Sequence, residues 1–300
     1  MLSHQISQKC KTFHDLLKVD KNRQIELEKI LGQKINSIKK LVGGSRDHIY
    51  SLVTDEGRYI FKSGDTDSIS SQIEFYEQYS DLPYLPQLIY SNSDRSELII
   101  TQITGEKSRE HYDKEAILTV LIDRFIFRYK IVNSELFGFT SKFLAGKTFS
   151  DFLVIQAKDA YSYIQDLFPP VVLEGIQKTI RECYKEKVFK QQYLLHGDLG
   201  FHNFFYSKNK LLGIIDPDPI IGHPVYDLMF AFCSTPEQIN PESLERSFDR
   251  LNNYFPINKS RMYDYFTIAL FKRIASCKKH HPNDLEKYMS IWKQMGVPNK

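Results

Sequence analysis

The sequence predicts an α+β protein with a small antiparallel-sheet lobe at its N-terminal end and a larger, mostly helical lobe after it. Two observations carry this prediction. Short runs of β-branched and aromatic residues are concentrated between residues 35 and 103, and the segments after Gly105 carry apolar residues mainly at helical spacing. A length of 300 residues suffices for two lobes of about 150 residues each. We therefore expect one lobe over residues 1–104 and a second over 105–300.

The composition is that of an ordinary globular protein. With 42% hydrophobic and 26% charged residues, it excludes wholesale disorder, a collagen and a coiled coil. No apolar run approaches the roughly 18 residues of a membrane span, and the first residues lack the apolar core of a signal peptide. The four cysteines form no CxxC pair, so neither a zinc knuckle nor a thioredoxin-like site is indicated. We expect a cytoplasmic protein with reduced thiols and no membrane partner.

The first lobe is expected to begin with a leading helical segment within residues 1–35. Apolar residues fall near helical spacing over 12–31, with a break at Asp20–Asn22. Strands are predicted next, because runs rich in β-branched and aromatic residues follow one another closely. These runs occupy residues 35–41, 48–54, 58–63 and 97–103.

Turn and helix signals connect these strands. Asp55-Glu56-Gly57 is typical of a hairpin turn between the second and third runs. A helical pattern returns over residues 69–80, and Pro83 and Pro86 close it. The resulting order of strands, one helix and further strands suits a small sheet with a single helix packed against it.

The second lobe is predicted to be mostly helical. Helical spacing of apolar residues covers 114–130 and 171–187, and 225–300 is expected to be helical for the most part. One compact strand pair interrupts this pattern at 203–216, with its turn at Lys208-Asn209. The aromatic-rich stretch 125–139 is more typical of a core than of a substrate pocket.

The charge is unevenly distributed along the chain. The net charge is +3, but residues 257–300 hold 9 basic and 3 acidic residues, a net charge of +6. Such an excess can attract phosphates or nucleic acid, but it is more typical of the solvated face of terminal helices. We therefore expect no nucleic-acid partner.

The stretch 194–228 holds the residues that point to chemistry. Asp198 follows His196-Gly197, Asn203 opens one arm of the predicted hairpin, and Asp216 ends the other arm. Because the arms have nearly equal length, antiparallel pairing brings Asn203 and Asp216 side by side, with Asp198 in the loop just before. Oxygen ligands without a His or Cys cluster suit Mg²⁺, which takes further ligands from substrate phosphates. A carboxylate beside that metal can position a hydroxyl and accept its proton in phosphoryl transfer.

These residues carry a resemblance to a known family. HGDLGFHN followed by IDPDPIIGHPVYDL resembles the aminoglycoside phosphotransferase and choline kinase family, which are small-molecule kinases with a protein-kinase-like fold. The family pattern HGDxxxxN, an ID pair, a Gly and a downstream Asp-Leu is matched by His196, Gly197, Asp198, Asn203, Ile215, Asp216, Gly222, Asp227 and Leu228. The resemblance implies that Asp198 is the catalytic base and that Asn203 and Asp216 hold Mg²⁺.

The resemblance also implies that the N-terminal lobe binds the nucleotide and the C-terminal lobe the acceptor. Lys62 lies where a kinase places the strand lysine that holds the α- and β-phosphates, paired with a glutamate of the next helix. We predict Glu74 as this partner, with Glu77 as the reserve.

Two backbone segments complete the predicted nucleotide site. The loop of Gly43, Gly44 and Ser45 resembles the family's phosphate-covering loop, because glycines let backbone N–H groups approach phosphates closely. The Walker pattern GxxxxGK[ST] is absent, so the sequence does not indicate a P-loop enzyme. Residues 98–105 resemble the hinge between lobes, where the backbone near Thr101 and Ile103 would pair with the adenine edge.

Three further residues of the motif are expected to support it. Asp227 is predicted to be structural, through hydrogen bonds to the backbone of the catalytic loop. His196 is predicted to be a packed histidine that orients this loop. Asp218, two residues beyond Asp216, has two open interpretations, contact with a second Mg²⁺ or a solvated, loop-capping role.

The predicted function is ATP- or GTP-dependent phosphoryl transfer to a hydroxyl of a small molecule, by a monomer or homodimer. The acceptor stays open among an aminoglycoside or other antibiotic, a sugar, an amino alcohol and a nucleoside-like compound. The basic segment 257–300 argues against a polycationic aminoglycoside, whereas the Ile-Asp-Pro-Asp-Pro run resembles the streptomycin-kinase branch. The alternatives are a catalytically silent kinase-fold binding protein and a protein kinase, the latter disfavoured because HRD, DFG and APE are absent.

Overall fold

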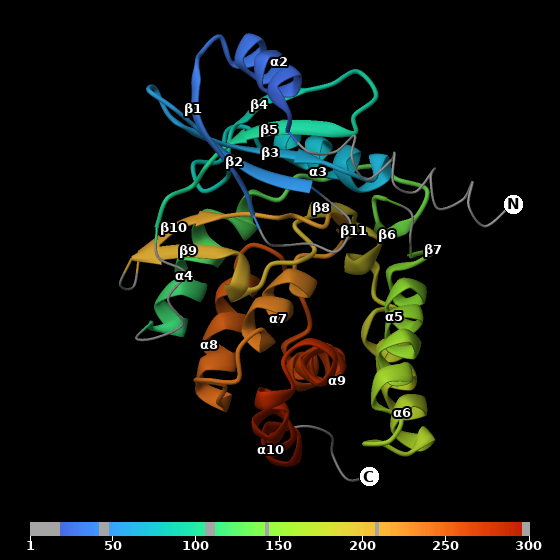
Figure 1. Ribbon diagram of the computed structural model, residues 1–300. Coiled ribbons are helices and arrows are strands. Elements are labelled where there is room, and N and C mark those ends of the chain that lie inside the picture. Colours follow the sequence, from blue (N-terminus) through green and yellow to red (C-terminus); the bar gives the residue numbers. More distant parts are fainter. Residues whose placement is uncertain (1–18, 42–47, 106–111, 142–143, 208–209, 296–300) are drawn as a thin grey trace, which may run out of the picture. The chain divides into compact units, whose positions relative to one another are not determined.

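Figure 1 shows the computed structural model, which describes residues 19–41, 48–105, 112–141, 144–207 and 210–295. The chain forms two compact units. The N-terminal unit comprises Met1–Ser80 and Pro86–Gln102, and the C-terminal unit comprises Asp81–Leu85 and Ile103–Lys300. The chain thus passes between the units two residues before the predicted boundary, and the short segment Asp81–Leu85 joins the second unit. The predicted α+β class, with a small sheet unit before a mostly helical one, is confirmed.

A five-stranded antiparallel sheet forms the centre of the N-terminal unit, with the order β1-β2-β3-β5-β4 (Figure 1). Its strands are β1 (Ile35–Lys40), β2 (His48–Thr54), β3 (Arg58–Ser63), β4 (Leu88–Ser91) and β5 (Glu97–Thr101). The predicted hairpin is confirmed, because the Thr54 N–H donates to the Gly57 carbonyl at 2.9 Å. β4 was not predicted, since its four residues are too few to show an alternating pattern.

Helix α2 (Lys21–Leu31) begins at the predicted break. The Asp20 carboxylate accepts a hydrogen bond from the Arg23 N–H at 2.8 Å and caps the helix. Leu27 of α2 is fully buried against apolar side chains of β1, β2, β3 and β5. The rest of the predicted leading helix, before residue 19, lies outside the described residues.

Helix α3 (Thr66–Gln78) packs against β4 and β5. It begins at Asp65, whose carboxylate accepts from the Ser68 N–H at 3.1 Å. In β5 the buried Ile99 belongs to the cluster around α2, and its neighbours Leu98 and Ile100 point to the opposite face because side chains alternate along a strand.

The C-terminal unit is built from seven α-helices in its described residues. They are α4 (Lys114–Arg124), α5 (Phe149–Ile164), α6 (Pro170–Cys183), α7 (Val225–Cys233), α8 (Pro241–Asn252), α9 (Met262–His280) and α10 (Leu285–Met295). α9 contacts α5, α6, α7 and α10, and Figure 1 shows it among them. Its buried residues lie all around its circumference, as expected for a helix within a core.

The helix predictions for this unit are partly confirmed. α6 confirms the helix predicted over 171–187 but ends at Cys183. The helix predicted over 114–130 ends at Arg124 and is followed by a 3₁₀ turn at Ile126–Arg128. α5 was missed because three of its buried positions are Gln156, Ala157 and Ala160, which weakens the apolar pattern. The Thr148–Asp151 capping box could have predicted the start of this helix from the sequence.

Two small sheets position the motif of the second unit. The predicted hairpin is confirmed as β9 (Phe204–Ser207) paired with β10 (Lys210–Ile214). A four-stranded sheet of order β7-β6-β11-β8 was not predicted. It consists of β6 (Phe137–Phe139), β7 (Ala145–Gly146), β8 (Tyr193–Leu195) and β11 (Ile220–Gly222), which are too short to show a period of two.

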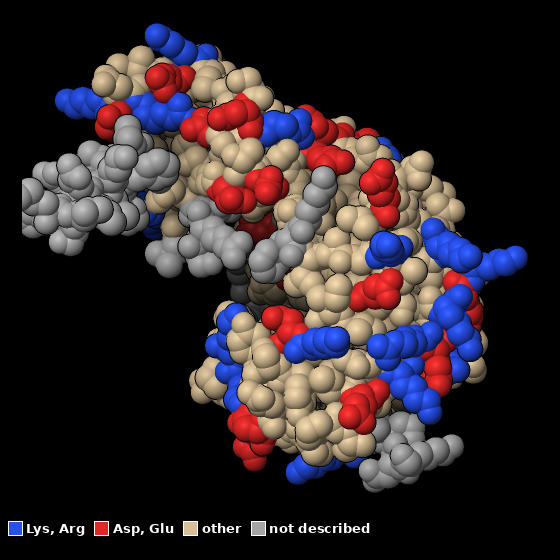
Figure 2. Space-filling model, turned by 90° about the vertical axis from the view of Figure 1, so that its right-hand side faces the viewer, with Lys and Arg blue, Asp and Glu red and all other residues tan. Residues whose placement is uncertain are grey.

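The basic C-terminal helices carry much of their charge in exposed ion pairs. Lys287 lies 3.0 Å from Glu237, Lys259 lies 2.8 Å from Asp249, and Lys278 pairs with Asp166. Figure 2 shows lysine and arginine side chains interspersed with aspartate and glutamate on the face that it displays. Within the described residues, no helix is long and apolar enough to cross a membrane.

A buried histidine in the C-terminal unit is expected to make the free energy of unfolding depend on pH. His223 follows β11 and is 1% exposed, enclosed by the rings of Phe189, Tyr193 and Phe255. Burial lowers its pKa to about 3, so the folded protein keeps it neutral while the unfolded chain takes up a proton below about pH 6.5. The contribution of His223 to the free energy of unfolding therefore falls as the pH falls below about 6.5, by up to about 1.4 kcal/mol per pH unit.

We expect His223→Phe to reduce this acid sensitivity. Urea unfolding between about pH 4.5 and 7.5 measures the slope of unfolding free energy against pH, which should be shallower in the variant. His280→Gln, at an exposed helix end, is the matched control and should keep the wild-type slope. An unchanged slope in His223→Phe would show that this residue is not a source of the acid sensitivity.

Candidate active site

The loop of His196, Gly197 and Asp198, predicted to be catalytic, follows β8 and has a backbone that only glycine accommodates at one position. Gly197 has φ 82°, and a Cβ built on it would lie 1.8 Å from the Asp218 carbonyl oxygen. This close approach is held by a hydrogen bond from the Asp218 N–H to the His196 carbonyl at 2.9 Å. The HGD sequence therefore packs tightly against the segment that follows the hairpin.

Asp198 and Asn203 are brought together as predicted. The Asn203 side-chain amide donates both to the Asp198 carboxylate and to the Asp198 backbone carbonyl, each at 2.9 Å. His202 Nε2 lies 3.2 Å from the same carboxylate. Burial of Asp198 acts to raise its pKa, but the hydrogen bond and charge of His202 outweigh it and the pKa lies below its usual value. Asp198 is therefore an ionised carboxylate at neutral pH, able to accept a hydrogen bond from a hydroxyl.

Asp216 ends the hairpin beside Asn203. The Ile215 N–H donates to the Asn203 carbonyl at 3.0 Å, so the pairing that β9 and β10 begin continues up to the residue before Asp216. Asp216 itself has φ 56°, a left-handed conformation that few residues other than Gly, Asn and Asp adopt. Such local strain is common where a side chain must be aimed at a functional position.

The oxygen groups at this end of the hairpin fit Mg²⁺. Because the NH₂ group of Asn203 donates to Asp198, its side-chain oxygen is the atom that could serve as a ligand, together with the carboxylate of Asp216. A carboxylate and an amide oxygen are ligands that magnesium accepts while it keeps waters and substrate phosphates. Across the described part of the chain, no group of three or more His, Cys, Asp or Glu side chains offers a competing metal site.

Two predicted supporting residues have the predicted contacts. The Asp227 carboxylate is fully buried and accepts from the His196 N–H at 2.8 Å, from the Gly197 N–H at 3.1 Å and from the Tyr129 hydroxyl. Burial raises the pKa of Asp227 to about 7, and the three donors act in the opposite direction. His196 is also fully buried, and its Nε2 lies 3.1 Å from the Ile215 carbonyl. Burial lowers its pKa to about 4, so it is a neutral, packed histidine.

In the N-terminal unit, Lys62 has a different partner from the predicted one. Lys62 in β3 is 4% exposed, and its ammonium donates to the Gln72 side-chain oxygen at 3.0 Å. Glu74 is exposed on α3, and the reserve choice Glu77 pairs with Arg95 at 3.1 Å. The structure therefore corrects the prediction. Position 72 lies on the buried face of α3, and position 74 is turned about 200° away from it because each residue advances a helix by about 100°.

The predicted backbone contacts of the nucleotide are only partly described. Gly43, Gly44 and Ser45 lie outside the described residues. The Thr101 N–H donates to the Gln87 carbonyl at 2.9 Å, so this donor is used within the sheet. Ile103 begins the C-terminal unit, and its backbone makes no hydrogen bond to another residue that the structure describes.

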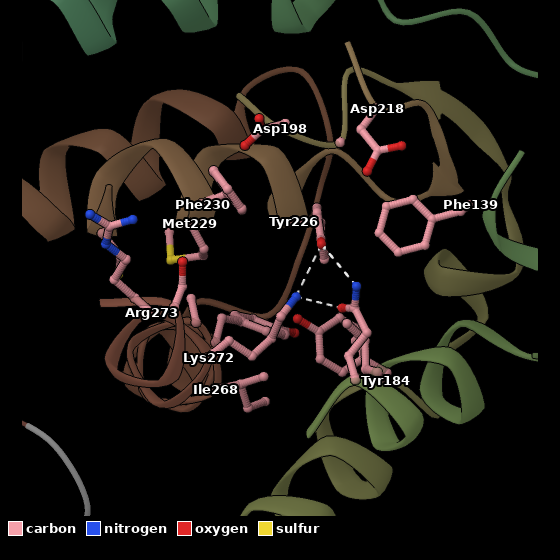
Figure 3. Close-up of a pocket in the computed structure, with 17 residues that line it drawn as sticks. Phe139, Tyr184, Asp198, Asp218, Tyr226, Met229, Phe230, Ile268, Lys272 and Arg273 are labelled. Carbon is pink, nitrogen blue, oxygen red and sulfur yellow. Dashed lines mark hydrogen bonds between the residues drawn. The ribbon is translucent and has the colours of Figure 1, made fainter. Parts of the chain in front are cut away.

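A pocket opens beside Asp198 within the C-terminal unit. It has a volume of about 240 Å³ and receives side chains from α5, α7 and α9 (Figure 3). Figure 3 shows Lys272, Gln156 and Tyr226 joined in a triangle of hydrogen bonds at its wall. The sequence did not single out these three residues. One feature of the sequence could have pointed to Lys272, because this charged residue interrupts the apolar positions of the 262–277 segment.

Known proteins identify the family of this chain. A model of the phosphotransferase enzyme family (APH) matches residues 37–256. The chain belongs to this family. It is a small-molecule kinase, and the enzyme class that the motif implied is thereby confirmed. No curated protein matches the sequence.

Solved structures of low sequence identity share the fold of this phosphotransferase. The aminoglycoside phosphotransferase APH(4)-Ia, in a complex with ADP and hygromycin B, matches with a TM-score of 0.58 and 15% identity, over 92% of this chain and 99% of that one. A putative fructosamine-3-kinase from Haemophilus somnus has a TM-score of 0.57 and 13% identity, over 91% and 94% of the two chains. The APH(2″)-IIa complex with streptomycin and ATP has a TM-score of 0.55 and 18% identity, over 94% and 99%. The predicted protein-kinase-like fold is confirmed.

Proposed function

We propose that this phosphotransferase moves the γ-phosphoryl group of a nucleoside triphosphate, with Mg²⁺, to a hydroxyl of a small molecule bound in the pocket beside Asp198. The observation that carries the proposal is the Asp198 carboxylate, which accepts a hydrogen bond from the Asn203 amide and lines a pocket large enough for part of a small molecule. ATP is the favoured donor, because complexes of two structural neighbours contain ATP or ADP. GTP is the alternative donor.

Each side chain has a defined task in this proposal. Asp198 orients the acceptor hydroxyl and takes its proton as the new oxygen–phosphorus bond forms and the bond to the leaving diphosphate breaks. Asn203 holds Asp198 and, together with Asp216, supplies oxygen ligands for Mg²⁺. The metal neutralises charge on the phosphates when it is bound. Lys62, positioned by Gln72, would hold the nucleotide phosphates, and the Gly43–Ser45 loop would cover them. The backbone near Thr101 and Ile103 would pair with the edge of the adenine ring. Asp218 stays a candidate for a second metal contact.

The proposal is tested by assaying the purified protein with Mg²⁺ and either ATP or GTP. The acceptor pool contains aminoglycosides, sugars, amino alcohols and nucleosides, and mass spectrometry detects the gain of one phosphoryl group. We expect a phosphorylated product that is lost when the metal is removed with a chelator and restored when Mg²⁺ is added. Nucleotide binding without any product would indicate a catalytically silent kinase fold, and the absence of both would contradict the proposed function.

A further inference from the structure

The pocket beside Asp198 is largely apolar, and this restricts the acceptor. Its wall contains aromatic and aliphatic side chains from several elements, including Phe139, Leu153, Tyr226, Met229, Phe230 and Ile268. Its charged lining residues are Asp198, Asp218, Lys272 and Arg273. In the view of Figure 3, the two carboxylates lie at one end and Lys272 lies toward the other, with Tyr226 between them. A ligand that fills this pocket needs an apolar body of about the size of a ring.

Lys272 is a partly buried lysine of the pocket wall without an acidic partner among the described residues. Its ammonium donates to the Tyr226 hydroxyl at 3.0 Å and to the Gln156 side-chain oxygen, and it lies 4.3 Å from the centre of the Tyr226 ring. Among the residues that the structure describes, no carboxylate lies within ion-pair distance of this ammonium. An ammonium has three donors, and only two acceptors are present here.

A partly buried lysine without a counter-charge is energetically unfavourable. Burial lowers the pKa of Lys272 to about 7, although the charge of Asp227 acts in the opposite direction. Buried charges in proteins are normally paired or bind a ligand of opposite charge. Because Lys272 lines the pocket, an anion inside the pocket can reach it and supply the missing charge.

We infer that the acceptor carries a carboxylate or another oxyanion on an apolar body, and that Lys272 binds this anion while a hydroxyl is presented to Asp198. The inference rests on the proposed function and names its substrate class. Arg273 adds a second positive charge to the lining, so a polycationic aminoglycoside would meet two cations here and only one carboxylate, Asp218, besides the catalytic one. The alternative is a purely structural role, in which the hydrogen bonds of Lys272 stabilise the packing of α5, α7 and α9.

Three acceptors that share a ring and a hydroxymethyl group, and carry para substituents of different charge, test this inference. They are para-(hydroxymethyl)benzoate, para-(hydroxymethyl)benzamide and para-(aminomethyl)benzyl alcohol, which carry a negative, a neutral and a positive group on the same ring. With Mg²⁺ and ATP, we expect kcat/KM for the carboxylate to exceed that for the ammonium compound by at least about tenfold. The neutral amide should lie between them.

Gln156→Glu separates ligand binding from a purely structural role of Lys272. The substitution conserves shape and gives Lys272 an internal carboxylate, so we expect the ratio of kcat/KM for the carboxylate acceptor to that for the neutral amide to fall to about one or below. Gln165→Glu, an exposed position at the end of α5, makes the same charge change outside the pocket and should keep the preference. Lys272→Arg, which keeps the positive charge, should also keep it. Thermal unfolding verifies that each variant is folded.

Binding of para-(hydroxymethyl)benzoate without nucleotide, followed by ligand-observed NMR, distinguishes the two possible failures. If wild type binds it and Gln156→Glu does not, the anion site holds even when no acceptor is phosphorylated, and only the proposed function fails. If transfer occurs but the ammonium compound is preferred, or all three are used equally, the inference is wrong while the proposed function stands. Folded wild-type protein that neither binds nor phosphorylates the carboxylate would also overturn the inference.

Discussion

Asp198→Asn is expected to lower kcat for phosphoryl transfer by at least about 10²-fold, the usual contribution of a positioned general base. The substitution keeps the size of the side chain but removes the charge and the ability to accept the hydroxyl proton. The amide of Asn203, which now donates to the carboxylate, would keep an oxygen partner, so the loop should stay folded. The measurement is the rate of product formation with Mg²⁺ and saturating ATP, using whichever acceptor the panel identifies.

A matched variant separates this effect from a general change in charge. Asp166→Asn removes an exposed carboxylate that pairs with Lys278, and it should leave kcat unchanged. Nucleotide binding should persist in both variants, because the proposed phosphate ligands are elsewhere. If Asp198→Asn retains the wild-type rate, another group must accept the proton and the assignment of Asp198 is wrong.

Asp227→Ala is expected to have the largest effect on stability. The carboxylate holds two consecutive backbone N–H groups, those of His196 and Gly197, and the hydroxyl of Tyr129, all of them buried. Its removal deletes these three buried hydrogen bonds, although the His196 N–H also contacts the Tyr129 oxygen at 3.3 Å. Breaking such a buried network costs about 3–5 kcal/mol. This corresponds to a decrease of roughly 5–8 °C in melting temperature for a protein of this size.

Thermal unfolding and urea titration measure this loss. Asp249→Ala is the control, because Asp249 is exposed and pairs only with Lys259 at the surface, which should change the unfolding free energy by less than about 1 kcal/mol. Activity should also fall in Asp227→Ala, since the backbone that carries Asp198 loses its anchor. A variant as stable as wild type would show that the catalytic loop is held by other contacts.

Much of the fold and of the catalytic loop could be predicted from the sequence because the contacts involved are local. Asp198 and Asn203 are five residues apart, and the hairpin that follows is set by two short arms and a turn. β2 and β3 have the predicted bounds, since alternation and a turn signal mark both of their ends. The structural roles of His196 and Asp227 followed from the family pattern that these residues match, and the contacts confirm them.

The sequence by itself therefore determined the family and the reaction class. Only the tertiary structure decided that Gln72 rather than Glu74 contacts Lys62, because the choice depends on which face of α3 meets the sheet. The same is true of the acceptor pocket, where Lys272 meets Gln156 and Tyr226 from 116 and 46 residues away. Contacts over such separations cannot be predicted from the periodicity of the sequence. Packing between helices, and not local backbone preference, brings these side chains together.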